Sequence, residues 1–183
     1  MTRINLLFFF LTFYFSVSAQ QPFAVTIADE PITAIPAIHS FAFAESNGKW
    51  LFIGGRTNGL HGFLTPFAFE TSYINSQITV VDPVANQNWT ATTASLPDSI
   101  REPVTSTNTE YYKDGNTLYM SGGYGWKSSI ADFVTFPTLT AIDISGLMNA
   151  VINGTSINSY FRQITDTNLA IAGAHLEKID TTF

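Results

Sequence analysis

The chain has no cysteine among its 183 residues, so neither a disulfide nor a thiolate ligand can form within it. Charged residues make up only 12%, the formal net charge is −6, and no stretch gathers basic residues. This distribution argues against nucleic acids and anionic membrane surfaces as partners. Long hydrophobic runs are also absent, because the longest, Leu6–Phe15, is well short of the roughly 20 residues that a spanning helix needs.

This apolar run is typical of a secretory signal peptide. Arg3 supplies a positive charge before it, and Val17–Ala19 supplies small residues where a signal peptidase cleaves. We predict cleavage before Gln20, which leaves 183 − 19 = 164 residues with a formal charge of −7 and no membrane span. The alternatives are a buried strand or a membrane anchor. An exported chain without disulfides suits a secreted, cell-surface or periplasmic protein, most readily a bacterial one.

The mature sequence favours an all-β fold. Thr, Ile, Val, Phe and Tyr are abundant, and turn residues recur about every ten positions. Few segments have helical spacing. The exception is "SGLMNAVI" (145–152), which is compatible with a short helical turn.

A strand that ends in two glycines occurs twice. The segments "SNGKWLFIGGRTNG" (46–59) and "DGNTLYMSGGYGWK" (114–127) each contain a tight-turn pair, a short apolar strand and then Gly-Gly. The glycine pairs are Gly54-Gly55 and Gly122-Gly123, at a spacing of 122 − 54 = 68. Because another strand-like run precedes each turn, over 38–46 and 107–114, each segment predicts a β-hairpin.

Two more strands follow each hairpin. In the first unit a strand ending at Asp82 is followed by one opened by Trp89, and in the second the corresponding strand reaches Asp143. The first unit is therefore predicted to have strands over Ile38–Ser46, Lys49–Ile53, Ile78–Asp82 and Trp89–Ala94. Four strands repeated in tandem are typical of one propeller blade. Phe23 and Phe161 stand where Trp89 does, each opening an outer strand.

These residues resemble the kelch-repeat β-propeller family. The resemblance is carried by the strands into Gly-Gly, the "ITVVDP" strand and Trp89, whereas the second unit departs from it by lacking the proline and the tryptophan. It implies a partial kelch-type propeller of four-stranded antiparallel blades, about two and a half of them, in an N-terminal fragment of a closed ring. The expected divisions are a signal peptide (1–19), an outer strand closing the last blade (20–36), blade 1 (37–97), blade 2 (98–166) and the start of blade 3 (167–183).

The loops after the glycine pairs, 56–76 and 124–137, are the predicted ligand-binding segments. Both are long and rich in aromatic residues, and long loops on a rigid scaffold commonly bind ligands. On the resemblance they emerge on the same face of neighbouring blades. The candidate contacts to a protein or glycan ligand are Arg56, His61, Tyr124, Trp126 and Lys127. The alternative is that the rings pack between blades and stabilise the loops.

Catalytic signals are weak. The three histidines, His39, His61 and His175, are far apart and have no metal-ligand spacing, so we expect neither a metal nor a cofactor. Asp82 and Asp143 repeat with the unit, which indicates turn hydrogen bonds rather than acid–base work. Without cysteine, the thioether-linked copper site of galactose-oxidase-type kelch enzymes cannot form in this chain.

Two classes of function stay open. One is an exported, non-catalytic propeller that binds a protein or carbohydrate. The other is the N-terminal part of a kelch enzyme acting on sugars, either an epimerase or a carbohydrate oxidase, with part of its site outside this chain. The regular aromatic and polar loops favour the first.

Overall fold

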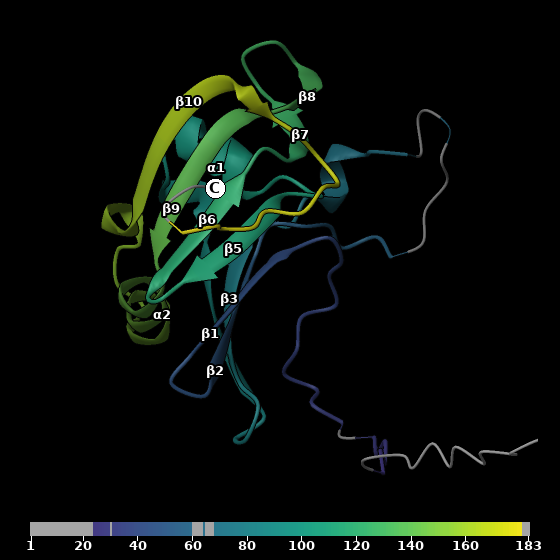
Figure 1. The fold of residues 1–183 in the computed structure, drawn as a ribbon, viewed down its shortest axis with the longest axis vertical. Helices are drawn as coiled ribbons and strands as arrows, with labels where there is room; N and C mark the ends of the chain where they lie inside the picture. The colour runs from purple at the N-terminus through teal and green to yellow at the C-terminus, as the bar shows by residue number, and fades with distance from the viewer. Residues whose placement is uncertain (1–23, 30, 60–63, 65–67, 181–183) are drawn as a thin grey trace, which may run out of the picture. The chain divides into compact units, whose positions relative to one another are not determined.

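The computed structural model describes residues 24–29, 31–59, 64 and 68–180 (Figure 1). The chain divides into two compact parts, Met1–Pro31 and Ile32–Phe183, and all the described strands lie in the second part. Below, "unit" refers to the sequence repeats only. Residues 24–29 are described without a strand or helix, so the pairing expected of the segment that starts at Phe23 stays a prediction. The predicted signal peptide (1–19) falls outside the described residues.

The first sheet has four antiparallel strands in the order β1-β2-β3-β4. Its strands are β1 (Ala42–Ser46), β2 (Lys49–Ile53), β3 (Gln77–Asp82) and β4 (Gln87–Thr92). Asn47 and Gly48 form the turn between β1 and β2 with φ values of +52° and +70°. A two-residue turn with both φ values positive matches the twist of the flanking strands, which is why Asn-Gly is favoured there.

The second sheet follows the same path, in the order β5-β6-β9-β10. Its strands are β5 (Glu110–Asp114), β6 (Thr117–Ser121), β9 (Pro137–Asp143) and β10 (Phe161–Ala170). A separate hairpin, β7 (Tyr124–Lys127) and β8 (Asp132–Thr135), lies between β6 and β9 in the chain. The prediction of a mostly β protein built from four-stranded antiparallel sheets is confirmed.

Helical segments connect these strands. They are the α-helices α1 (Asp98–Val104) and α2 (Ile144–Asn153), with the 3-10 helices η1 (Thr71–Tyr73), η2 (Thr93–Ser95) and η3 (Asn158–Tyr160). The α2 helix includes the segment for which a helical turn was predicted. It is capped by Asp143, whose carboxylate accepts a hydrogen bond from the Gly146 N–H, and it ends at Gly154 in the left-handed conformation.

Both hairpins are shorter at their first strand than predicted. The strand expected from Ile38 begins only at Ala42, because Ser40 has a φ of +55° that interrupts extended backbone. Asn108 has a φ of +53° and shortens the second hairpin in the same way, so β5 begins at Glu110. The structure thus places a left-handed residue at matching positions of the two units.

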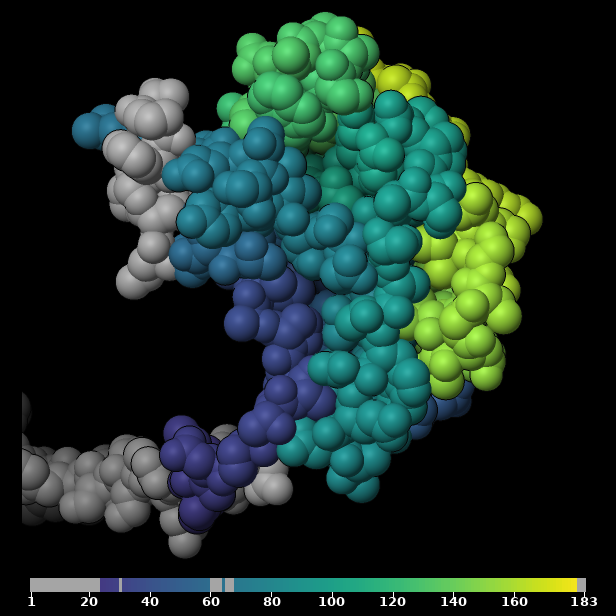
Figure 2. All heavy atoms as spheres, turned by 180° about the vertical axis from the view of Figure 1, so that it is seen from behind, coloured from purple at the N-terminus to yellow at the C-terminus, as the bar shows by residue number. Residues whose placement is uncertain are grey.

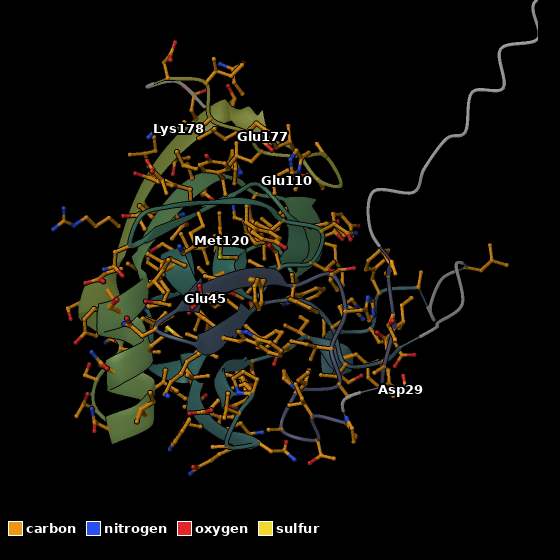
Figure 3. All side chains as sticks on the ribbon, turned by 60° about the horizontal axis from the view of Figure 1, so that its bottom comes forward. Asp29, Glu45, Glu110, Met120, Glu177 and Lys178 are labelled. Carbon is orange, nitrogen blue, oxygen red and sulfur yellow. The ribbon has the colours of Figure 1, made fainter. Side chains whose placement is uncertain are left out.

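The main core lies between the two sheets and α2. Alternate residues of the strands face it, and the opposite face of the first sheet carries a second apolar cluster around Phe52 and Val81. Met120 lies in this interior (Figure 3). Trp89 of β4 is half-buried and packs against the same core. The buried residues on the strands that form it are Ala42, Ala44, Leu51, Ile53, Ile78, Val80, Leu118, Met120, Ile142 and Phe161.

The same backbone hydrogen bonds recur from one unit to the next. The Asn108 N–H donates to the Ser40 carbonyl (3.3 Å), and the Gly173 N–H donates to the Asn108 carbonyl (3.0 Å). Gly173 also has a positive φ, of +75°, like Ser40 and Asn108. Residues 171–173 therefore repeat the geometry of 106–108 one unit further along the chain.

The glycine pairs make another of these recurring contacts. The Gly55 N–H donates to the Ser106 carbonyl (2.9 Å), and the Gly123 N–H donates to the Ile171 carbonyl (2.8 Å). All four paired glycines have positive φ, and a Cβ on Gly55 would stand 2.3 Å from the His39 carbonyl oxygen. Two glycines are needed because the chain turns in the left-handed region while backbones approach closely.

Candidate functional site

The loops that follow the two glycine pairs meet at one end of the part that spans Ile32–Phe183. Phe69, from the first loop, contacts Tyr124 of β7 with ring centroids 5.0 Å apart. Figure 2 shows the residues around 125–135 in green at this end, beside the blue-green residues around 70. In Figure 1 the β7–β8 hairpin and α2 lie at opposite ends of the second sheet.

Four half-buried rings from these loops form one cluster, which we call the aromatic cluster: Phe69, Tyr124, Trp126 and Phe133. Tyr124 and Phe133 stack at 5.6 Å, and Trp126 meets Phe133 edge-on at 5.4 Å. Tyr124 and Trp126 share a face of β7 because they are two residues apart on one strand. The contacts among the rings stabilise the loops, and each ring keeps part of its surface exposed.

Arg56 lies beneath this cluster. Its side chain is buried at 2% exposure, and its guanidinium carbon stands 5.3 Å from the centre of the Phe69 ring. It donates a hydrogen bond to the Glu70 carbonyl (2.7 Å). Burial lowers the pKa of the Arg56 guanidinium, and the Glu70 carboxylate acts in the opposite direction. These contacts hold the first loop against the rings, through a cation–π contact and a charge-assisted hydrogen bond.

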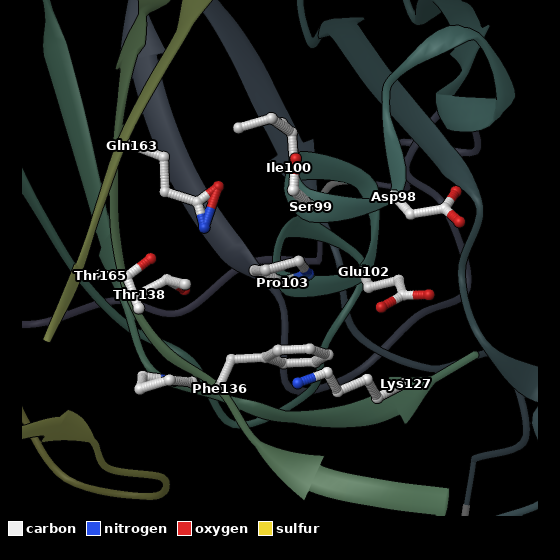
Figure 4. A pocket seen from close by; sticks show the side chains of 11 residues that line it. Asp98, Ser99, Ile100, Glu102, Pro103, Lys127, Phe136, Thr138, Gln163 and Thr165 are labelled. Carbon is white, nitrogen blue, oxygen red and sulfur yellow. The ribbon is translucent and has the colours of Figure 1, made fainter. Parts of the chain in front are cut away.

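Beside the β7–β8 hairpin is a pocket of about 410 Å³ (Figure 4). It is formed by α1, by the start of β9 and by β10, and the face of β7 opposite Trp126 contributes Lys127 to it. Glu102 on its α1 side accepts hydrogen bonds from the backbone N–H (3.0 Å) and the hydroxyl (2.5 Å) of Ser128. The residues that line it are Asp98, Ser99, Ile100, Glu102, Pro103, Lys127, Phe136, Pro137, Thr138, Gln163 and Thr165.

The predicted ligand contacts are distributed over three places. Tyr124 and Trp126 belong to the aromatic cluster, Arg56 supports it from below, and Lys127 lines the pocket. His61 lies outside the described residues. His39 hydrogen-bonds through its ring to Ser40 and Asn58.

Sequence reasoning did not single out the pocket residues of α1 and β10. Glu102 and Gln163 are 61 positions apart (163 − 102) and no motif joins them. Of the pocket residues, only those in the aromatic loop 124–137, among them Lys127 and Phe136, lie in a segment that the sequence predicted to bind a ligand. The α1 helix was not predicted either, because only 145–152 showed helical spacing, and Pro103 sits inside α1.

The repeated aspartates close turns at the other end of the sheets. Asp82 accepts hydrogen bonds from the N–H groups of Val84 (3.1 Å) and Ala85 (2.9 Å) and pairs with Lys49 (2.7 Å). The hydrogen bond from Lys49, followed by those from the backbone, lowers the pKa of Asp82. Asp143 caps α2 and also accepts from the Asn116 amide (2.7 Å).

Within the part of the chain that the structure describes, no group of three or more His, Cys, Asp or Glu is placed to hold a metal ion. Over the same residues, no helix has the length and apolar character required to cross a bilayer. No protein-family model matches the chain, and no curated protein matches it.

Proposed function

We propose that this chain is part of an exported kelch-type propeller that binds a carbohydrate or protein ligand with the end that carries its long loops. The two four-stranded sheets are consecutive blades in this proposal. The repeat of strand order, of left-handed residues and of hydrogen bonds at the glycine pairs supports it, because tandem blades place equivalent backbone groups in equivalent contacts.

The observation that carries the binding role is the aromatic cluster. Tyr124 and Trp126 come from one loop and Phe69 from the other, so the two loops present a single aromatic surface. Large rings with few rotatable bonds are enriched at binding surfaces, since they provide contact area at low entropic cost. Of the two ligand classes, carbohydrate is favoured by the pocket on the other face of β7, which combines apolar side chains with hydrogen-bonding ones.

Screening the secreted protein on a glycan array tests this proposal. We expect binding that Trp126→Ala weakens at least about tenfold, because a tryptophan at the centre of a binding surface commonly contributes about 2 kcal/mol. The matched control is Tyr111→Ala, which removes a ring of 37% exposure on β5, outside the cluster. Equal losses of affinity in the two variants would contradict the proposed function. So would a parent protein that binds no glycan on the array and no protein of the cell envelope.

A further inference from the structure

We propose that the pocket beside the β7–β8 hairpin binds one neutral sugar unit of the ligand, through the amide of Gln163 and the threonine hydroxyls next to it. This inference rests on the proposed function and assigns the ligand to the carbohydrate class. In Figure 4 the Gln163 side chain extends its amide from β10 toward the space between the strands and α1.

The size and walls of the pocket fit such a ligand. Its volume of about 410 Å³ is near the lower end of the range of small-molecule sites, about 300–1,000 Å³. Ile100, Pro103 and Phe136 provide apolar wall. A sugar ring has a C–H face that packs on such a wall while its hydroxyls point elsewhere.

Gln163 is the pocket-lining residue whose side-chain oxygen lacks a partner. Its Oε1 is buried, and no described residue donates a hydrogen bond to it. Buried amide oxygens are costly when unpaired, and rotation of the terminal amide would turn this oxygen toward the pocket, where a ligand hydroxyl is a suitable donor. A neighbouring ligand hydroxyl can accept a bond from the Gln163 NH₂ group, so an amide suits vicinal hydroxyls.

Two threonines extend this polar surface. Thr165 of β10 is paired in register with Thr138 of β9, and both line the pocket. Each hydroxyl donates one hydrogen bond and accepts others, as sugar hydroxyls do. The wall formed by Gln163, Thr138 and Thr165 is therefore neutral and complementary to a polyol.

The charges of the pocket argue against a strongly anionic ligand. Lys127 contributes one positive charge and Glu102 one negative charge, so these two cancel. Asp98 adds a second carboxylate, which pairs with Arg101 at 2.6 Å. Because Lys127 and Arg101 each offset one carboxylate, the pocket has no net positive charge to offset the two charges of a phosphorylated sugar, and the desolvation of its phosphate would disfavour it.

The test is ligand-observed NMR on the secreted chain with the methyl glycosides of glucose, galactose and mannose, and with glucose 6-phosphate. We expect at least one methyl glycoside to bind more tightly than the phosphate. We expect Gln163→Met, which keeps the side-chain length and removes both the amide oxygen and the NH₂ group, to weaken the binding of that glycoside at least tenfold. Gln87→Met on β4, a strand that does not line the pocket, is the matched control and should bind like the parent chain.

A second variant guards against a folding defect. Thr165→Val removes one pocket hydroxyl at nearly constant volume, and we expect it to weaken the binding of the glycoside severalfold while the thermal melt is unchanged.

Equal affinity in the Gln163 variant and its control would overturn the pocket assignment, as would a preference for the phosphate. If array glycans bind in a Trp126-dependent manner and no methyl glycoside binds, this inference fails alone. If no glycan binds and a protein does, the carbohydrate class fails. If nothing binds, the proposed function fails as well.

Discussion

Replacing Gly55 by alanine is expected to lower the free energy of unfolding by about 2–5 kcal/mol. Gly55 has a φ of +82°, a conformation that costs an L-residue about 1–2 kcal/mol. Its new Cβ would also stand 2.3 Å from the His39 carbonyl oxygen, and relieving such a contact typically costs about 1–3 kcal/mol. Urea unfolding followed by circular dichroism measures the sum.

The matched control is Gly48→Ala in the β1–β2 turn. Gly48 has a φ of +70°, and a Cβ there would meet nothing within 4 Å. It carries the conformational cost without the clash, so we expect a loss of about 1–2 kcal/mol. If both variants lose the same amount, the close approach of backbones at the glycine pair is not what requires glycine.

Replacing Trp89 by alanine is expected to cost about 2–4 kcal/mol. Fully buried tryptophans cost about 3–5 kcal/mol on truncation, and Trp89 is only half-buried. Its ring packs against the main core from the outer strand β4, so its loss opens a cavity at that edge of the core. The midpoint of urea unfolding should fall with little change in slope.

The control for this variant is Val84→Ala. Val84 is 94% exposed in the turn before β4, so its truncation should change the stability by less than about 0.5 kcal/mol. A loss below about 1 kcal/mol for Trp89→Ala would place the ring at the surface. The equivalence of Trp89 and Phe161 on the two outer strands would then lose its physical basis. The prediction that Trp89 opens its strand is itself wrong, because β4 runs over Gln87–Thr92 and not over Trp89–Ala94.

Local rules predict the hairpins well. The Asn47-Gly48 turn requires two positive φ values, which that residue pair adopts readily, and the pleat of β2 places Leu51 toward the main core and Phe52 on the opposite face. The 68-residue spacing of the glycine pairs then predicts that the second hairpin repeats the first. In both cases the signal lies in a few neighbouring residues.

Other elements depend on contacts that no short window contains. The first strand begins only at Ala42 because Ser40 is left-handed, and the Ser40 carbonyl accepts a hydrogen bond from the Asn108 N–H of the next repeat. The α1 helix forms in spite of Pro103, and it packs near β7. Sequence periodicity reports neither of these long-range effects.

The residues of the candidate site were likewise predicted only in part. The aromatic residues of both loops were evident from composition, and the structure brings Tyr124 and Trp126 together with Phe69. The pocket was not evident, because Gln163 reaches it from a strand whose neighbours look ordinary in sequence. Arg56 was predicted as a ligand contact, and the structure places it under the rings at 2% exposure.

A ¹⁵N-labelled titration tests the location of the binding surface most directly. The purified chain is titrated with the glycan that binds best on the array, and amide and side-chain signals are followed. We predict shifts confined to the β7–β8 hairpin and the pocket, including the Trp126 indole N–H and the Gln163 side-chain amide. Shifts confined to the opposite turns, at Gly48 and Asn116, or no shifts with any arrayed glycan, would contradict carbohydrate binding at the loop-bearing end.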